Sequence, residues 1–185
     1  NYENLFIYKN LLKIAESKED FLSCIEYINS IEQYVSDDDL KRLLLEKWIK
    51  YNKIIKEYDL IVEELNDNIL NTTKKSDIVY FSIEKARTYI LMNKLQKSTE
   101  ILNDIIENHL DNKMLKNEMC EVYYLLGYIN LKYEYDFSKA ELNFNNSVEL
   151  SSINKFGKRS KSLIESIENY YNSLDEIEYV DSIKG

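Results

Sequence analysis

The sequence has no proline, and only three of its 185 residues are glycine. Proline and glycine form most tight turns and interrupt helices. A β-rich domain of this length would need many of both, because every hairpin requires a turn. Their scarcity predicts long helices joined by short connections, and therefore an all-α fold.

Long apolar runs and positive charge are also scarce. The sequence contains no stretch of about 18 apolar residues, the length that a membrane-spanning helix needs. Its 24 basic side chains are outnumbered by 33 acidic ones, which gives a net charge of −9. Because proteins bind nucleic acid through basic patches, we expect neither a membrane nor a nucleic acid as a partner of this segment. The basic stretch at residues 155–161 is interpreted as a solvated helix end.

The two cysteines, Cys24 and Cys120, lie far apart among apolar, helix-forming neighbours. We interpret them as small buried hydrophobic residues, because their positions match no metal-binding spacing. Free cysteines are typical of a reducing compartment, which predicts a cytoplasmic location. The chain starts at Asn1 rather than at a methionine, so we expect it to be part of a longer protein.

Catalytic patterns are missing as well. The single histidine, His109, lies at a predicted helix end, where a solvated side chain is the more ordinary interpretation. There is no glycine-rich phosphate loop, no Gly-x-Ser-x-Gly and no cysteine–histidine pairing. Carboxylates such as Glu63, Glu64 and Asp67 have the spacing of a single solvent-exposed helix face. We therefore predict a binding protein that is not an enzyme and has no cofactor or metal.

The sequence is rich in apolar residues that recur at three- and four-residue intervals, the signature of amphipathic helices. Short polar joints force neighbouring helices to run antiparallel. Ser17 is predicted to cap the second helix and Ser36 the third, each ahead of acidic residues in the first turn. We predict a single domain over residues 1–185, with hairpins at about 2–35, 37–71, 76–110 and 113–151 and a capping helix at about 156–174.

A repeat is visible in the second helix of each hairpin. Ala140, Phe144 and Ser147 follow a pattern in which a small residue is followed four positions later by a large apolar one. Equivalent small or apolar anchors fall at positions 24, 61, 98 and 140, at intervals of 37, 37 and 42 residues. Tyr123 and Gly127 match a first-helix signature, with one extra residue in the joint that follows.

These motifs resemble tetratricopeptide repeats, which have about 34 residues each. The resemblance implies a right-handed superhelical stack of about four antiparallel helical hairpins plus a C-terminal capping helix. Lys85 stands in a usual leucine position and Asn130 in a usual tyrosine position, so the repeat frame is fixed only to within about a residue.

In such a stack the first helix of each hairpin lines a concave surface. A peptide would be held there by aromatic rings, by arginine or lysine at its carbonyls and by glutamate at its amines. Equally, these positions could be half-buried residues that pack between hairpins. The inward positions that the frame predicts are Glu46, Lys47 and Lys50, then Tyr80, Ile83, Glu84 and Arg87, and finally Glu121, Tyr124, Tyr128 and Lys132.

Three stretches resemble a narrower group, the peptide-sensing repeat regulators of Firmicutes and their phages, the arbitrium receptors in particular. They are residues 123–128, 135–139 and 162–172. This resemblance implies a cytoplasmic regulator, with quorum-sensing or transcriptional roles, whose dimer or head–body geometry shifts when a short peptide binds. No basic helix-turn-helix segment is present, so a DNA-binding head would lie outside these residues, or the target would be a protein. The alternative is a generic scaffold or adaptor that joins protein partners.

Overall fold

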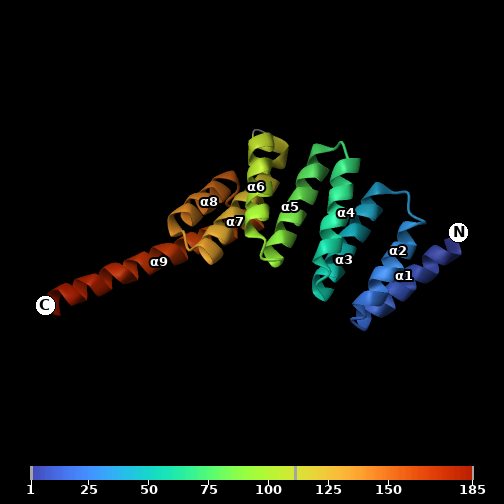
Figure 1. Ribbon diagram of the computed structural model, residues 1–185, viewed down its shortest axis with the longest axis horizontal. Coiled ribbons are helices and arrows are strands. Elements are labelled where there is room, and N and C mark those ends of the chain that lie inside the picture. The colour runs from blue at the N-terminus through green and yellow to red at the C-terminus, as the bar shows by residue number, and fades with distance from the viewer. Residues whose placement is uncertain (1, 111, 185) are drawn as a thin grey trace. The chain divides into compact units, whose positions relative to one another are not determined.

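A computed structural model describes the backbone of residues 2–110 and 112–184, and the side chains from 3 to 110 and 112 to 173. Within these ranges every regular element is a helix and none is a strand, which confirms the all-α prediction (Figure 1). In chain order the elements are α1 (Tyr2–Ser17), α2 (Phe21–Glu32), α3 (Asp38–Ile55), α4 (Tyr58–Asn71), α5 (Lys75–Leu91), α6 (Leu95–His109), the 3₁₀ turn η1 (Lys113–Leu115), α7 (Lys116–Ile129), the π-helical turn η2 (Asn130–Glu134), α8 (Phe137–Leu150) and α9 (Lys155–Lys184).

The predicted cap of α2 is wrong. Ser17 is the last residue of α1, where its hydroxyl donates to the Ile14 carbonyl at 2.7 Å. Asp20 caps α2 instead, with its side chain accepting from the Ser23 backbone N–H at 3.2 Å. A carboxylate in this position accepts the hydrogen bond, as a hydroxyl would. Unlike a hydroxyl, it also carries a negative charge that is attracted to the positive end of the helix dipole.

The predicted cap of α3 is wrong in the same way, because an aspartate caps this helix instead of the serine. Asp37, rather than Ser36, accepts from the backbone N–H of Leu40 at 2.8 Å. Asp136 caps α8 in the same way, accepting from Lys139 N–H at 3.0 Å. Three helices therefore begin with an aspartate whose side chain bonds the N–H three residues later.

The repeat positions coincide with the starts of the second helices. α2, α4, α6 and α8 begin at residues 21, 58, 95 and 137, so each anchor is the fourth residue of its helix. The last interval between anchors is five residues longer than the two before it, and five residues is the length of η2. The anchors and the residues four positions later are all buried: Cys24, Ile61, Ser98 and Ala140, with Ile28, Leu65, Leu102 and Phe144.

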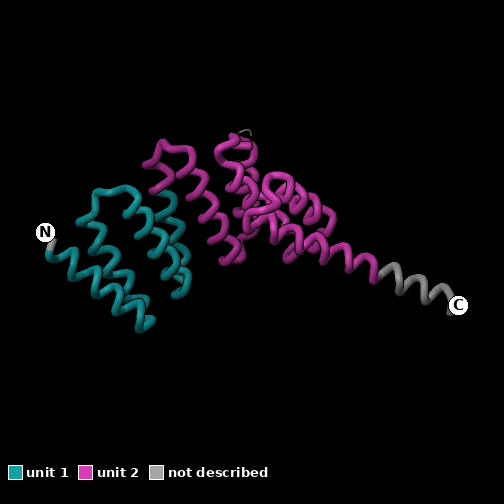
Figure 2. Tube along the Cα trace, turned by 180° about the vertical axis from the view of Figure 1, so that it is seen from behind, with its two compact units in different colours: residues 1–67 teal, residues 68–185 magenta. Residues whose placement is uncertain are grey.

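The contacts between helices group the chain into two compact units, unit 1 (Asn1–Asp67) and unit 2 (Asn68–Gly185), which Figure 2 colours separately. In unit 1, α1 packs on α2 and α2 packs on α3. The buried residues of that core come from all three helices and from the turn before α3. They are Leu12, Ala15, Cys24, Ile28, Ile31, Val35, Leu44 and Tyr51.

In unit 2 consecutive helices from α5 to α9 pack against each other, and α7 also contacts α5 and α9. One core cluster is shared by α5, α6 and α7, and a second by α8 and α9. α7 is therefore the central helix of unit 2. Its glycine, Gly127, lies against the fully buried ring of Phe144 on α8.

The end of α9 and the turn geometry of the first helix of the fourth hairpin differ from the prediction. α9 continues to Lys184 rather than ending near residue 174, because no proline or glycine occurs between Gly157 and Gly185 to stop it. The first helix of the hairpin predicted over residues 113–151 consists of three successive elements with different turns: η1, α7 and η2. It ends at Tyr135, which has a left-handed backbone conformation with φ of 57°.

Candidate functional site

Unit 2 contains a cavity of about 310 Å³ between α5, α7 and the start of α9. Its wall combines charged, amide and aromatic side chains with one buried aliphatic residue. α5 contributes Tyr80, Ile83, Glu84 and Arg87, α7 contributes Asn117, Glu118 and Glu121, and the α8–α9 connection and first turn of α9 contribute Asn154, Lys155 and Phe156.

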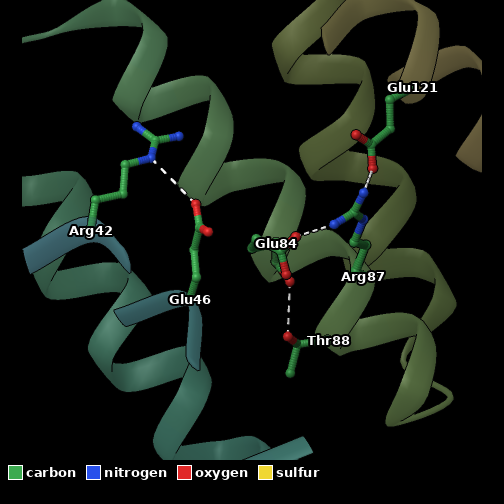
Figure 3. A network of polar contacts seen from close by, with 6 residues as sticks. All are labelled: Arg42, Glu46, Glu84, Arg87, Thr88 and Glu121. Carbon is green, nitrogen blue, oxygen red and sulfur yellow. Dashed lines mark hydrogen bonds and ion pairs between the residues drawn. The ribbon is translucent and has the colours of Figure 1, made fainter. Parts of the chain in front are cut away.

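Arg87 lies at the centre of this wall, with its guanidinium between two carboxylates (Figure 3). Its Nη1 donates to Glu84 Oε1 and its Nη2 donates to Glu121 Oε1. The side chains of Glu84 and Glu121 are only 8% and 12% exposed, whereas that of Arg87 is 33% exposed. Two nearly buried carboxylates thus share one partly exposed guanidinium.

The helical repeat explains why these groups meet. Tyr80, Ile83, Glu84 and Arg87 are separated by three- and four-residue steps, so they occupy one face of α5. The Thr88 hydroxyl donates to the Glu84 carbonyl at 2.8 Å, within the same buried turn. Since α5 and α7 pack together, the α5 face meets the α7 residue Glu121.

The start of α9 forms the third side of the cavity. Asn154 caps this helix, with its Oδ1 accepting from the backbone N–H of Phe156 at 2.9 Å and of Gly157 at 2.8 Å. Its Nδ2 donates to Asn117 Oδ1 on α7 at 3.3 Å. The Phe156 ring is thereby held near the guanidinium, with 5.9 Å between the Arg87 Cζ and the ring centroid. This is within the range of a cation–π contact.

Five of the predicted inward positions line this cavity: Tyr80, Ile83, Glu84, Arg87 and Glu121. The other five lining residues were not predicted to belong to a site: Asn117, Glu118, Asn154, Lys155 and Phe156. Asn154 stands directly before a helical stretch, where asparagine is a typical N-cap. This position could have indicated that the start of α9 is fixed in place. The charge of residues 155–161 alone indicates a solvated helix end and says nothing of this cap.

Tyr124 and Tyr128 do not line the cavity. The Tyr124 ring packs against Phe156 and Phe144, with centroid distances of 5.4 and 6.1 Å. Tyr128 stacks on Tyr124 at 6.4 Å. Both tyrosines therefore pack against other aromatic rings of unit 2. Lys132 lies in η2 and is exposed.

The remaining predicted residues belong to unit 1. Glu46 pairs with Arg42 one turn earlier on α3, with 3.6 Å between Nε and Oε1 (Figure 3). Lys50 Nζ lies 5.7 Å from the centroid of the Tyr51 ring. Lys47 is held by α1, because its Nζ donates to Glu16 Oε1 at 2.6 Å.

Glu16 also accepts from the Tyr51 hydroxyl at 2.5 Å. Burial raises the pKa of the Glu16 carboxyl, but the hydrogen bonds from Lys47 and Tyr51 outweigh it, so the net pKa lies below the ordinary value. Burial, and then the bond to the Glu16 carboxylate, raises the pKa of Tyr51. Burial also raises the pKa of the nearby Cys24 thiol, which stays protonated at neutral pH.

Two kinds of feature are missing from the described part of the chain. In residues 2–110 and 112–184, no helix has both the length and the apolar character needed to cross a bilayer. Over the same residues, no three side chains of the metal-ligating types converge on one point. The lining of the unit 2 cavity instead offers a guanidinium, carboxylates, amides and aromatic rings, which suit hydrogen bonding and ring contacts.

Comparison with known proteins gives no relative. No family model, curated protein or solved structure matches this chain.

Proposed function

We propose that this chain is a helical-repeat domain of the tetratricopeptide type that binds a short, extended peptide, and that the cavity of unit 2 is part of its binding groove. The observation that carries the proposal is the Arg87 cluster, in which a guanidinium, two carboxylates and an aromatic ring line one cavity. A peptide presents the complementary groups, namely carbonyls, amides and side chains of mixed polarity.

The cluster has hydrogen-bonding capacity left for a ligand. A guanidinium carries five N–H donors, and the bonds to Glu84 and Glu121 use two of them. The others are available to peptide carbonyls or a terminal carboxylate. Lys155 is exposed beside them, and the rings of Tyr80 and Phe156 offer apolar surface to a peptide side chain.

The size of the cavity limits what it can hold. At about 310 Å³ it is at the lower end of ligand pockets, which range from roughly 300 to 1,000 Å³. It would therefore hold two or three residues of an extended peptide of about six. The rest of such a peptide would bind along the concave surface that the repeat pattern predicts.

Under this proposal the chain belongs to a cytoplasmic signalling or transcriptional regulator that is not an enzyme. The regulator would act through a protein partner or a second copy of the chain. The competing proposal is a scaffold or adaptor that joins proteins. It is favoured by large apolar side chains on the surface of α1, where Phe6, Ile7 and Ile14 are 68%, 51% and 50% exposed. A protein partner could cover them.

Affinity selection tests the peptide proposal. The protein is incubated with a synthetic mixture of random hexapeptides, bound peptides are identified by mass spectrometry, and each is remeasured by calorimetry. We expect Arg87→Gln to weaken binding at least about tenfold, because hydrogen bonds to charged groups contribute about 1.5–3 kcal/mol. Lys155→Gln should also weaken it. Lys139→Gln is the matched control, since its exposed lysine lies on α8 away from the cavity.

Arg87→Gln leaves two nearly buried carboxylates without their guanidinium and could impair folding, so circular dichroism must show native helix content. Lys155→Gln removes only an exposed charge and keeps the test valid if Arg87→Gln unfolds. The proposal is wrong if no hexapeptide is enriched, or if enriched peptides bind both cavity variants as tightly as the control.

A further inference from the structure

Unit 1 has a cavity of its own, of about 180 Å³, between α2, α3 and α4. It is lined by Ile28, Asn29 and Glu32 of α2, Leu45 and Trp48 of α3, and Glu64 of α4. Ile28 is fully buried. Trp48 is the only tryptophan in the sequence.

The charged groups of this cavity have one sign. Glu32 and Glu64 reach it from different helices, and none of its six lining residues is a cation. Glu32 is also the last residue of α2, so the partial negative charge of the helix C-terminus adds to the two carboxylates. A positively charged group entering this cavity would be attracted by the Glu32 carboxylate and by this helix end.

The apolar part of the lining suits the stem of a basic side chain. Leu45 offers partly exposed aliphatic surface, and an indole is the aromatic ring that attracts cations most strongly. A volume near 180 Å³ is below the roughly 300–1,000 Å³ of pockets for whole small molecules. It is enough for one long side chain, whose methylene groups pack while its charged head meets the carboxylates.

From this combination we infer that the cavity of unit 1 is a binding site for a single lysine or arginine side chain presented by a partner protein. The site is separate from the peptide cavity of unit 2 and does not depend on the function proposed for it. The net charge of −9 would favour the approach of a basic partner surface.

Trp48 provides the test, because it lines this cavity and its fluorescence and indole N–H resonance are those of the only tryptophan in the sequence. The probes are N-acetyl-arginine amide and N-acetyl-lysine amide. Their uncharged counterparts, N-acetyl-citrulline amide and the lysine amide acetylated on both nitrogens, are the controls. We expect a saturable change with at least one cation, no saturable change with either neutral analogue, and weaker binding at higher salt.

Variants locate the binding. Glu32 is exposed, so Glu32→Gln should fold normally, and we expect it to weaken binding of the cation at least about fivefold. Glu26→Gln, which removes an exposed carboxylate of α2 that does not line the cavity, should leave it unchanged. The inference is overturned if neither cation shifts the indole resonance saturably, if the neutral analogues bind equally well, or if Glu32→Gln has no effect.

Discussion

Gly157, in the first turn of α9, lies closer to the preceding connection than any side chain would permit. A Cβ atom added there would be 1.6 Å from the Ser151 carbonyl oxygen and 2.7 Å from its carbon. Both are backbone atoms and cannot turn aside. Because Gly157 follows Phe156, this close approach also determines where the aromatic wall of the unit 2 cavity lies.

We predict that Gly157→Ala lowers the free energy of unfolding by about 1–3 kcal/mol, the usual cost of forcing extra atoms into a packed site. Urea unfolding followed by circular dichroism measures it. Ser152→Ala, in the same connection but exposed, is the control and should change little. If Gly157→Ala were as stable as Ser152→Ala, the connection would have to move aside freely. That result would contradict the close packing at Gly157.

At the scale of single residues, helical spacing predicts which side chains share one face of a helix. Tyr80, Glu84 and Arg87 share a face of α5 by spacing alone, and the repeat period places Glu121 opposite them. Phe156 could not be placed in this way. Its position depends on the hydrogen bonds of Asn154 and on the close approach at Gly157, which are properties of a connection rather than of a period.

At the scale of helices, α1 is tied to α3 by one carboxylate. Glu16 accepts hydrogen bonds from Lys47 and Tyr51, two residues one turn apart on α3. These bonds lower the pKa of Glu16. A carboxyl whose folded pKa is depressed stabilises the fold above its unfolded pKa, and this contribution is lost as the pH falls through the folded value.

We therefore predict that Glu16→Gln destabilises the protein by about 1.5–3 kcal/mol at pH 7, where hydrogen bonds to a charged group are intact. The difference should shrink as the pH falls below the ordinary glutamate value of about 4.3. Thermal unfolding of both proteins across this range measures it, with Glu26→Gln, an exposed carboxyl on α2, as the control. A difference independent of pH would contradict the role of the Glu16 charge.

Helix boundaries show the limits of periodicity. The starts of α2, α4, α6 and α8 reproduce the intervals of 37, 37 and 42 residues between the sequence anchors. The π-helical turn η2 was not predicted, although the sequence carries one extra residue in that joint. There Asn130 donates to Glu134 at 2.7 Å and accepts from Asn143 of α8 at 2.8 Å, a side-chain network that a helical period cannot reveal.

At the scale of the whole chain, composition and apolar periodicity were enough to predict that the fold is all-helical. The absence of proline and the scarcity of glycine leave helices uninterrupted, and the apolar period gives each helix a buried face. The superhelical stack, the single domain and the peptide ligand stay predictions. They depend on how separate packed units are arranged and on what they bind, which local spacing does not determine.

Amide hydrogen exchange, measured with and without the tightest hexapeptide from the selection, tests the central claim most directly. Hydrogen exchange reports protection along the whole chain, so it locates the peptide without assuming a site. We predict slower exchange in α5, in α7 and at the start of α9, around Arg87, Glu121 and Phe156. Protection confined to other segments, or none at all with a peptide known to be bound, would contradict the assignment of this cavity as the peptide site.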